Sequence, residues 1–166
     1  QLASKYNTYA ATRSFETTAG DTVKIGGGDY GWVINKKGEA AQIVEDIKNG
    51  ESVTREPKYE QRAFVEGADD IGNTYIEIDY TNQHLWYYKD GSLVVDSDIV
   101  SGNLNNGNGS PDGVFKVISR QSPATLKGED YESDVTYFMP FAYNVGLHDA
   151  SWRSSFGGSI YKNGGS

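Results

Sequence analysis

The chain has 166 residues, 37% of them hydrophobic, and a formal net charge of -8 at pH 7, so it is long enough for one medium domain or two small ones. No apolar run approaches the roughly 18 residues that a membrane-spanning helix needs. The acidic balance repels phosphate backbones, which argues against a nucleic-acid partner. The sequence contains no cysteine, which excludes disulfides, Cys-ligated metal centres and a thiol nucleophile within these residues.

The first part of the chain, residues 1–72, is predicted to form a small α+β unit. Apolar residues at 40, 43, 44 and 47 recur at helical spacing, and Gly50 stands where a helix C-cap belongs, so a helix is expected between Gly38 and Gly50. The glycines at 26–28 are expected to form a plain turn, since no Gly-Lys-Ser/Thr follows them. Short strands are expected at 22–25, 32–34 and 61–65.

The second part, residues 73–166, alternates with the period of two that is typical of strands, which predicts a mostly β domain. Three strands joined by short turns form a predicted β-meander between residues 75 and 95. Residues 102–112 are almost free of apolar side chains and are expected to form a surface loop. Further strands are expected at 114–118, 135–141 and 144–148.

The two histidines suggest different roles. His84 directly follows a turn and is expected to face water without a function, and Asp96 and Asp98 favour a solvated strand face over acid/base work. His148 ends an apolar strand and Trp152 lies four residues further on, so a site histidine and a structural histidine both remain open. The histidines stand apart and no second ligand has metal-binding spacing, so neither a metal nor another cofactor is expected.

Aromatic residues in the predicted meander suggest a third type of site. Trp86 and Tyr88 share a face of their strand, whereas Tyr87 points to the other side. Exposed aromatic rings on one face form stacking platforms for sugar rings, which leaves a carbohydrate-binding β domain as a further hypothesis.

Five motifs in order resemble the catalytic domain of the L,D-transpeptidases, which have the YkuD fold. The resemblance implies a YkuD-like β-sandwich after the α+β unit, and the residues upstream of it, 1–72, resemble the peptidoglycan-binding domain that precedes it in some Gram-positive members. The motifs are Tyr75-Ile76-Glu77-Ile78-Asp79, Gln83-His84-Leu85-Trp86-Tyr87-Tyr88-Lys89-Asp90-Gly91, Ile99-Val100-Ser101-Gly102, Ser110-Pro111-Asp112-Gly113-Val114-Phe115 and Gly146-Leu147-His148-Asp149.

The resemblance implies an acyltransferase that cross-links peptidoglycan stem peptides through a cysteine thioester and releases D-Ala. Its motif is Ser-His-Gly-Cys, and Ser166 matches the first residue of this motif. Both ends of the chain are therefore expected to be cuts in a larger protein, the catalytic domain is expected to be C-terminally truncated, and this chain is expected to be inactive. The implied catalytic residues are His148 and Ser166, and the implied substrate-binding residues are Tyr137, Met139, Trp152 and Gly165.

The resemblance also implies partners and a location. The partners are peptidoglycan stem peptides and, for the complete enzyme, carbapenem β-lactams. The expected location is extracellular, in the cell wall or at the outer face of the cell membrane, with any membrane anchor outside this chain. The alternative hypothesis is a non-catalytic peptidoglycan-binding module with a decayed transpeptidase fold.

Overall fold

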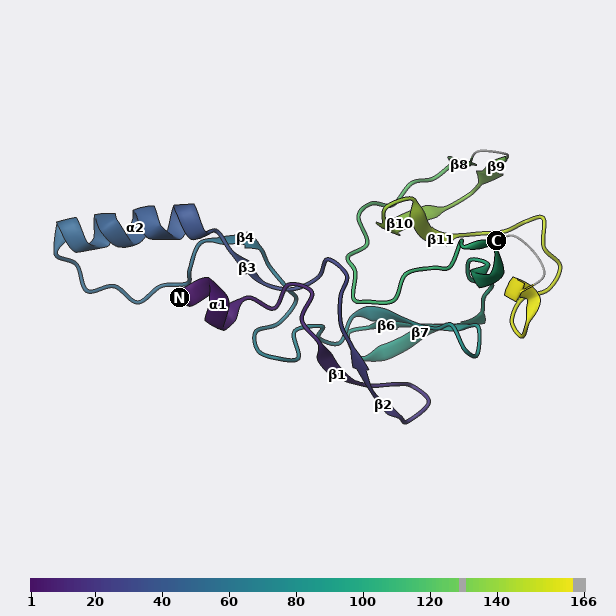
Figure 1. Cartoon of the computed structure of the whole chain (residues 1–166), viewed down its shortest axis with the longest axis horizontal. Helices are drawn as coiled ribbons and strands as arrows, with labels where there is room; N and C mark the ends of the chain where they lie inside the picture. The colour runs from purple at the N-terminus through teal and green to yellow at the C-terminus, as the bar shows by residue number, and fades with distance from the viewer. Residues whose placement is uncertain (129–130, 163–166) are drawn as a thin grey trace.

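The computed structural model describes residues 1–128 and 131–162, in which helices gather near the N-terminus and antiparallel strands dominate the rest (Figure 1). No helix in these residues is long and apolar enough to cross a membrane. The first part contains α1 (Leu2–Tyr6), β1 (Arg13–Glu16), β2 (Thr22–Ile25), β3 (Val33–Ile34), α2 (Lys36–Asn49) and β4 (Tyr59–Gln61). The second part contains β5 (Tyr75–Asp79), β6 (His84–Lys89), β7 (Ser92–Asp98), the 3₁₀ turn η1 (Leu104–Asn106), β8 (Ala124–Lys127), β9 (Glu132–Val135), β10 (Phe138–Ala142), β11 (Val145–His148) and the 3₁₀ turn η2 (Ile160–Lys162).

The predicted fold class, an α+β unit followed by a mostly β domain, is confirmed. The described strands pair antiparallel, as β1-β2, β3-β4, β5-β6-β7, β8-β9 and β10-β11. The sheet β5-β6-β7 is the predicted meander. Its register sets Trp86 of β6 opposite Glu77 of β5 and Asp96 of β7, so these three side chains share one face.

Helix α2 forms where the spacing predicts it. The side chain of Asn35 caps its first turn by accepting from the Gly38 N–H at 2.8 Å, and Gly50 ends it in the left-handed conformation with φ 69°. The apolar residues that define its period are nevertheless exposed, and the helix stands out from the body of the chain (Figure 1). Its buried residue is Glu39, whose carboxylate accepts from Arg55 Nη1 at 3.0 Å and from the Lys58 N–H at 2.7 Å.

A buried ion pair lies at the centre of the N-terminal part. Arg13 donates through Nε to Asp70 Oδ1 at 2.5 Å and through Nη2 to Oδ2 at 3.0 Å, and the Asp70 side chain is fully buried. The Thr8 hydroxyl donates to the same carboxylate, and the Tyr30 hydroxyl donates to the Asp70 carbonyl at 2.7 Å. Every acceptor of this buried carboxylate therefore has a partner, as burial of a charge requires.

The N-terminal part is joined to the second part by backbone pairing. Gly28 forms a parallel bridge with Val114, whose carbonyl accepts from the Asp29 N–H at 3.1 Å. Asp29 Oδ1 in turn accepts from the Lys116 N–H at 3.0 Å, and Lys116 Nζ donates to Gln61 Oε1 at 2.5 Å. The turn at residues 27–30 thus docks on the extended segment 113–116.

Three predicted strands differ from the structure. The one expected at 135–141 is divided between β9, which ends at Val135, and β10, which begins at Phe138. The one expected at 61–65 is β4, which ends at Gln61, because the Val65 carbonyl accepts from the Trp32 indole instead of a neighbouring strand. The one expected at 114–118 is not a strand, because Val114 pairs only with the distant Gly28. The sequence analysis also missed α1, β1, β8 and β9. The expected surface loop at 102–112 contains η1, and its first two residues are buried.

Candidate functional site

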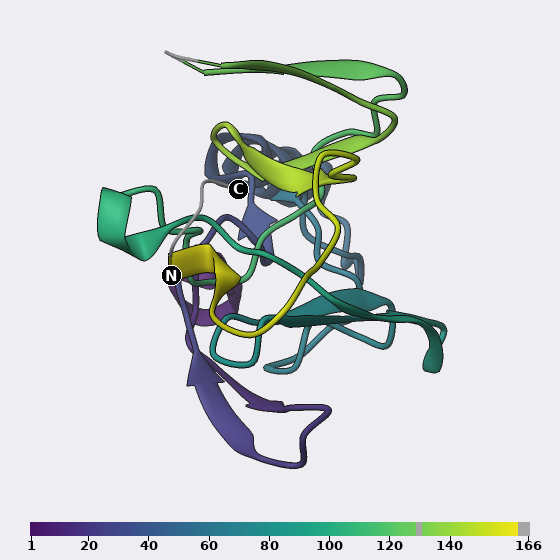
Figure 2. The ribbon, with the colours of Figure 1, turned by 90° about the vertical axis from the view of Figure 1, so that its right-hand side faces the viewer.

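The candidate site lies on the β10-β11 hairpin. Figure 2 shows this yellow-green hairpin directly beneath the β8-β9 hairpin. His148, the last residue of β11, pairs with Phe138, the first residue of β10. The imidazole is half-buried, and the hairpin turn at Tyr143 lies at the other end. The two strands therefore hold His148 on a paired, hydrogen-bonded backbone and not on a loop.

The contacts of His148 fix its ring. Nδ1 lies 2.9 Å from the Asp149 carbonyl oxygen, which only accepts, so in the neutral ring the proton is on Nδ1 and the lone pair is on Nε2. The Trp152 indole stacks against the imidazole, with ring centroids 5.8 Å apart and planes at 29°. This arrangement presents an oriented acceptor nitrogen beside an exposed aromatic ring.

Asp149 anchors the opposite strand to this site. Its carboxylate accepts from the Tyr137 N–H at 2.7 Å and from the Thr136 N–H at 3.1 Å. These backbone hydrogen bonds, that of Tyr137 foremost, lower the pKa of Asp149 below its ordinary value. The carboxylate therefore stays ionised and fixes how residues 136–137 enter β10.

The structure brings only some of the predicted site residues together. Tyr137 is held next to the hairpin because its backbone N–H donates to the Asp149 carboxylate. The Arg120 guanidinium lies 5.8 Å from the centroid of the Tyr137 ring. Met139 pairs with Leu147, one register position from His148, so the two side chains point to opposite faces of the hairpin. Gly165 and Ser166 lie outside the described residues. The predictions for all of these residues remain open.

Phe138 and Arg120 also belong to this surface. Phe138 shares the face of His148, and its ring covers Gly146, where an added Cβ would lie 2.4 Å from Phe138 Cε2. Arg120 reaches Tyr137 from the segment before β8. No sequence pattern indicates Arg120, because its contact with Tyr137 depends on the path of the chain before β8.

Two surface pockets lie away from His148. A pocket of about 330 Å³ lies beside β8 and β9, and one of about 350 Å³ lies between the β1-β2 hairpin and β5-β6. Neither is lined by His148. Among the described residues, no group of three or more His, Cys, Asp or Glu side chains could hold a metal ion.

The second histidine has partners that the sequence analysis did not foresee. His84 Nε2 lies 2.6 Å from Asp96 Oδ1, and Nδ1 lies 2.8 Å from Asp98 Oδ1. Its side chain is only 21% exposed, whereas the two carboxylates are 56% and 61% exposed. The expectation that this ring simply faces water is therefore wrong, although the two aspartates do lie on a solvated face.

Comparison with known proteins decides the family. The family model of the L,D-transpeptidase catalytic domain, YkuD, matches residues 73–166, more than half of the chain. The chain belongs to the L,D-transpeptidases. A model of a family of proposed peptidoglycan-binding domains matches residues 1–55. The predicted family and its enzyme class, a peptidoglycan-modifying acyltransferase, are confirmed. The search of curated proteins found no match to the chain.

Solved structures of this family resemble the chain over almost all of its length. A cysteine-to-serine mutant of the Enterococcus faecium L,D-transpeptidase is 39% identical, with a TM-score of 0.82, and the match covers 99% of this chain and 67% of that one. The Ldtfm-avibactam carbamoyl enzyme gives the same identity and TM-score, with 99% and 66% covered. The E. faecium catalytic domain acylated by ertapenem is 46% identical over 58% of this chain and 78% of that one, with a TM-score of 0.51. The chain thus spans about two thirds of the first two relatives.

Proposed function

We propose that this transpeptidase chain recognises the peptide stem of peptidoglycan at the β10-β11 hairpin, with His148 and Trp152 as the contact residues. The observation that carries the proposal is the position of the His148 imidazole between the Asp149 carbonyl and the Trp152 ring. The hydrogen bond to the carbonyl uses Nδ1 and leaves Nε2 as the acceptor nitrogen. The indole supplies an apolar surface for an alanine methyl, and Nε2 supplies an acceptor for a peptide N–H.

The chemistry proposed for the catalytic form follows from the family. A cysteine thiolate would attack the stem, D-Ala would leave, and an amine of a second stem would take the acyl group from the thioester. His148 would lie beside the reacting atoms and exchange a proton through Nε2. We place the reaction in the wall of a Gram-positive cell, outside the membrane, with stem peptides and β-lactams as the molecules that reach the cysteine.

A second candidate is a peptidoglycan-binding module without catalysis. The observation that favours it is the match of residues 1–55 to a family of proposed peptidoglycan-binding domains. Both candidates require that the stem peptide bind at His148, and they differ in whether a covalent bond follows.

Binding is tested by titrating the ¹⁵N-labelled chain with a tetrapeptide stem that ends in D-Ala. We expect the Trp152 indole N–H signal to shift, and Trp152→Ala to weaken binding roughly tenfold, the equivalent of about 1.4 kcal/mol. Tyr9→Ala is the matched control, since Tyr9 is 51% exposed and Trp152 is 46% exposed. Equal affinity in all three proteins would contradict the proposal.

Mass spectrometry of the same samples tests the covalent step. Because the chain has no cysteine, we expect no mass increase after incubation with ertapenem or with the stem peptide. An acyl adduct on this chain would show that another nucleophile acts and would overturn the role assigned to the cysteine.

A further inference from the structure

One face of the β5-β6-β7 sheet carries a row of aromatic rings. His84, Trp86 and Tyr88 alternate along β6, so their side chains share a face, and Tyr75 lies opposite Tyr88. The rings form two close pairs. The centroids of His84 and Trp86 are 4.5 Å apart, and those of Tyr75 and Tyr88 are 5.2 Å apart. We call these four residues the aromatic row; its β6 members span about 13 Å along the strand.

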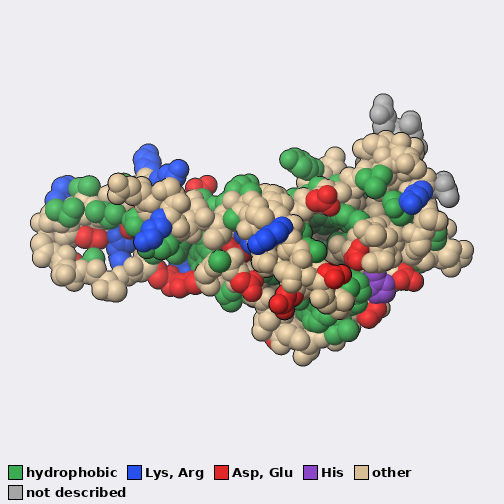
Figure 3. Space-filling model, turned by 60° about the horizontal axis from the view of Figure 1, so that its bottom comes forward, with side chains coloured by type: hydrophobic (Ala, Val, Ile, Leu, Met, Phe, Trp, Pro, Cys, Tyr) green, Lys and Arg blue, Asp and Glu red, His purple; other side chains and the backbone are tan. Residues whose placement is uncertain are grey.

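Carboxylates border this row on both sides. Glu77 and Asp79 of β5 lie opposite Trp86 and His84, and Asp96 and Asp98 of β7 lie opposite the same two residues. In Figure 3 a purple histidine lies among red acidic side chains next to a green apolar patch. The charged side chains at these register positions are thus all acidic, which disfavours phosphate polymers and other polyanions.

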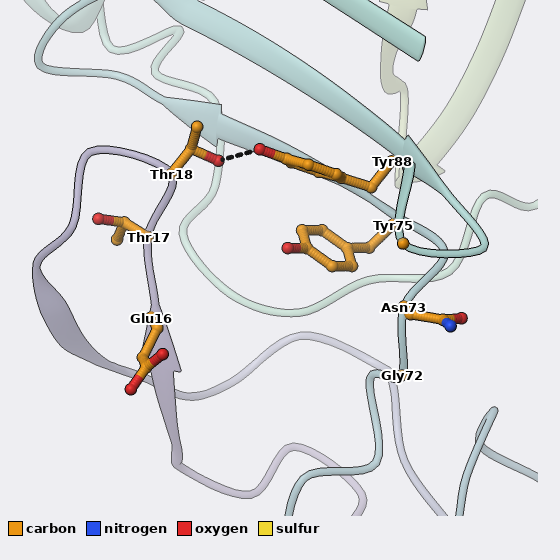
Figure 4. A pocket seen from close by; sticks show the side chains of 8 residues that line it. Glu16, Thr17, Thr18, Gly72, Asn73, Tyr75 and Tyr88 are labelled. Atoms are coloured by element: carbon orange, nitrogen blue, oxygen red, sulfur yellow. Dashed lines mark hydrogen bonds between the residues drawn. The ribbon is translucent and has the colours of Figure 1, made fainter. Parts of the chain in front are cut away.

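The row ends in a pocket at the junction of the two parts of the chain. Its volume is about 350 Å³, within the range of small-ligand sites. Figure 4 shows the rings of Tyr75 and Tyr88 on one side and Thr17 and Thr18 of the β1-β2 hairpin on the other. Asn73 and Glu16 also line it. Two aromatic rings and several polar residues therefore line one space.

Hydrogen bonds hold this pocket in shape. The Thr18 hydroxyl lies 3.0 Å from the Tyr88 hydroxyl and donates to Glu77 Oε2 at 2.6 Å, and the Thr18 N–H donates to Glu77 at 3.0 Å. Phe15 of β1 packs edge-on against Tyr75, with centroids 5.5 Å apart. The walls come from both parts of the chain, so the pocket depends on their docking.

We propose that the aromatic row and its pocket bind a neutral saccharide chain of N-acetylated sugars, the chemical class of the glycan strands of peptidoglycan. Aromatic faces carry partial negative charge and match the flat C–H faces of pyranose rings. Asp96 and Asp98, which are 56% and 61% exposed, can accept hydroxyl and amide N–H groups through the carboxylate oxygens that do not face His84. The proposal extends the proposed function, because the enzyme would hold the glycan strand here while its stem peptide lies at His148.

The test is an NMR and calorimetric titration of the 166-residue chain with N-acetylglucosamine oligomers of two, four and six units. The three tryptophan indole N–H signals separate the outcomes. Trp86 reports on the row and Trp152 on the peptide site. Trp32, which is buried and whose indole donates to the Val65 carbonyl at 2.7 Å, is the internal control. We expect only the Trp86 signal to shift and the affinity to rise with oligomer length.

Variants decide whether the row carries the binding. We expect Trp86→Ala to weaken the affinity for the hexamer at least about tenfold and Tyr88→Phe to weaken it by a smaller factor. The control Tyr143→Asn replaces a tyrosine that is 94% exposed, at a turn with φ 50° where asparagine is tolerated, and should change nothing. If Trp86→Ala does not fold, the shift of the Trp86 indole N–H signal in the unaltered chain decides whether the row binds the saccharide.

Three results would overturn the proposal. They are the absence of saccharide binding, binding that leaves the Trp86 signal unmoved, and preference of the row for a lysine-containing peptide over the neutral sugar. Because the stem peptide is read out at Trp152 and the saccharide at Trp86, failure of one proposal leaves the other measurable.

Discussion

At the scale of single residues, His84 is the group whose charge the fold controls most directly. Both ring nitrogens face carboxylate oxygens, so both bonds form only when the ring is protonated. The hydrogen bond to Asp96, and then that to Asp98, raises the pKa of His84 above its ordinary value, although burial opposes the shift. Asp79 on the neighbouring strand adds to the negative field.

The raised pKa has a defined consequence for stability. A group whose pKa is higher in the folded state contributes stability that is present below its unfolded pKa of about 6.5. That stability is lost as pH rises through the folded pKa. We therefore expect the unfolding free energy to decrease as pH rises from about 6 through the folded pKa of His84, measured by urea unfolding together with NMR titration of the ring.

His84→Gln is the control for this pH dependence. It should remove the decrease above pH 6 while leaving the rest of the pH profile unchanged. A folded-state pKa at or below the ordinary value of histidine would contradict the prediction.

Spacing along the chain indicates the contact between His148 and Trp152, because the two residues lie within five positions of each other. The partners of His84 could not be predicted in the same way. They lie 12 and 14 residues away, and only the register of β6 against β7 brings them to the ring. The Arg13–Asp70 pair is more remote still, since its members are 57 positions apart in sequence.

At the scale of elements, the contact of Gly28 with Val114 leaves no room for a side chain. Gly28 has φ 80°, and a Cβ there would lie 2.0 Å from the Val114 carbonyl oxygen. Gly27 has nearly the same φ, 84°, but open space around its Cβ position. Substitution of Gly27 therefore measures the free-energy cost of the left-handed backbone conformation alone. Substitution of Gly28 measures that cost together with the cost of the clash with Val114.

We expect Gly27→Ala to lower the unfolding free energy by about 1–2 kcal/mol, the cost of a left-handed conformation in a residue with a side chain. Gly28→Ala should lower it by roughly 3 kcal/mol or more, since the added methyl also separates the backbone from residue 114. Chemical denaturation of both variants checks the difference. Equal losses would show that the approach of the two backbones is not tight.

An element can be predicted from the sequence when the residues that determine it lie close together along the chain. Helix α2 has its capping Asn35, its period and Gly50 in one continuous stretch, so the sequence alone predicts it. The expected strand at 114–118 failed because its only bridge is to Gly28. The turn residue Gln83 is fully buried, because its side chain bonds Ser101, 18 residues away.

At the scale of the whole molecule, the chain exposes more surface than its mass predicts. Its accessible area is 11034 Å², whereas a compact monomer of 18.2 kDa exposes about 8,100 Å². Part of the excess is apolar. The exposed apolar residues include Ile43, Val44 and Ile47 on α2, Leu93, Val94 and Val95 on β7, and Val117 and Ile118.

This surface should bind hydrophobic dyes. We expect anilinonaphthalene sulfonate fluorescence in the presence of the chain to exceed that of a compact protein of equal mass, because apolar patches bind the dye. Ile47→Glu, at a position that is 73% exposed, should reduce the signal without loss of helix in circular dichroism. A signal no higher than that of the compact reference would contradict the prediction.

The docking of residues 27–30 on residues 113–116 also sets an order for folding. The bond from Lys116 to Asp29 closes 87 residues of chain, and contacts of such separation form late because the loop-closure entropy must be overcome first. During synthesis, the N-terminal turn leaves the ribosome long before its docking edge exists. Nascent chains that stop before Val114 would therefore display an unpaired turn at Gly28, available to a chaperone or to another chain.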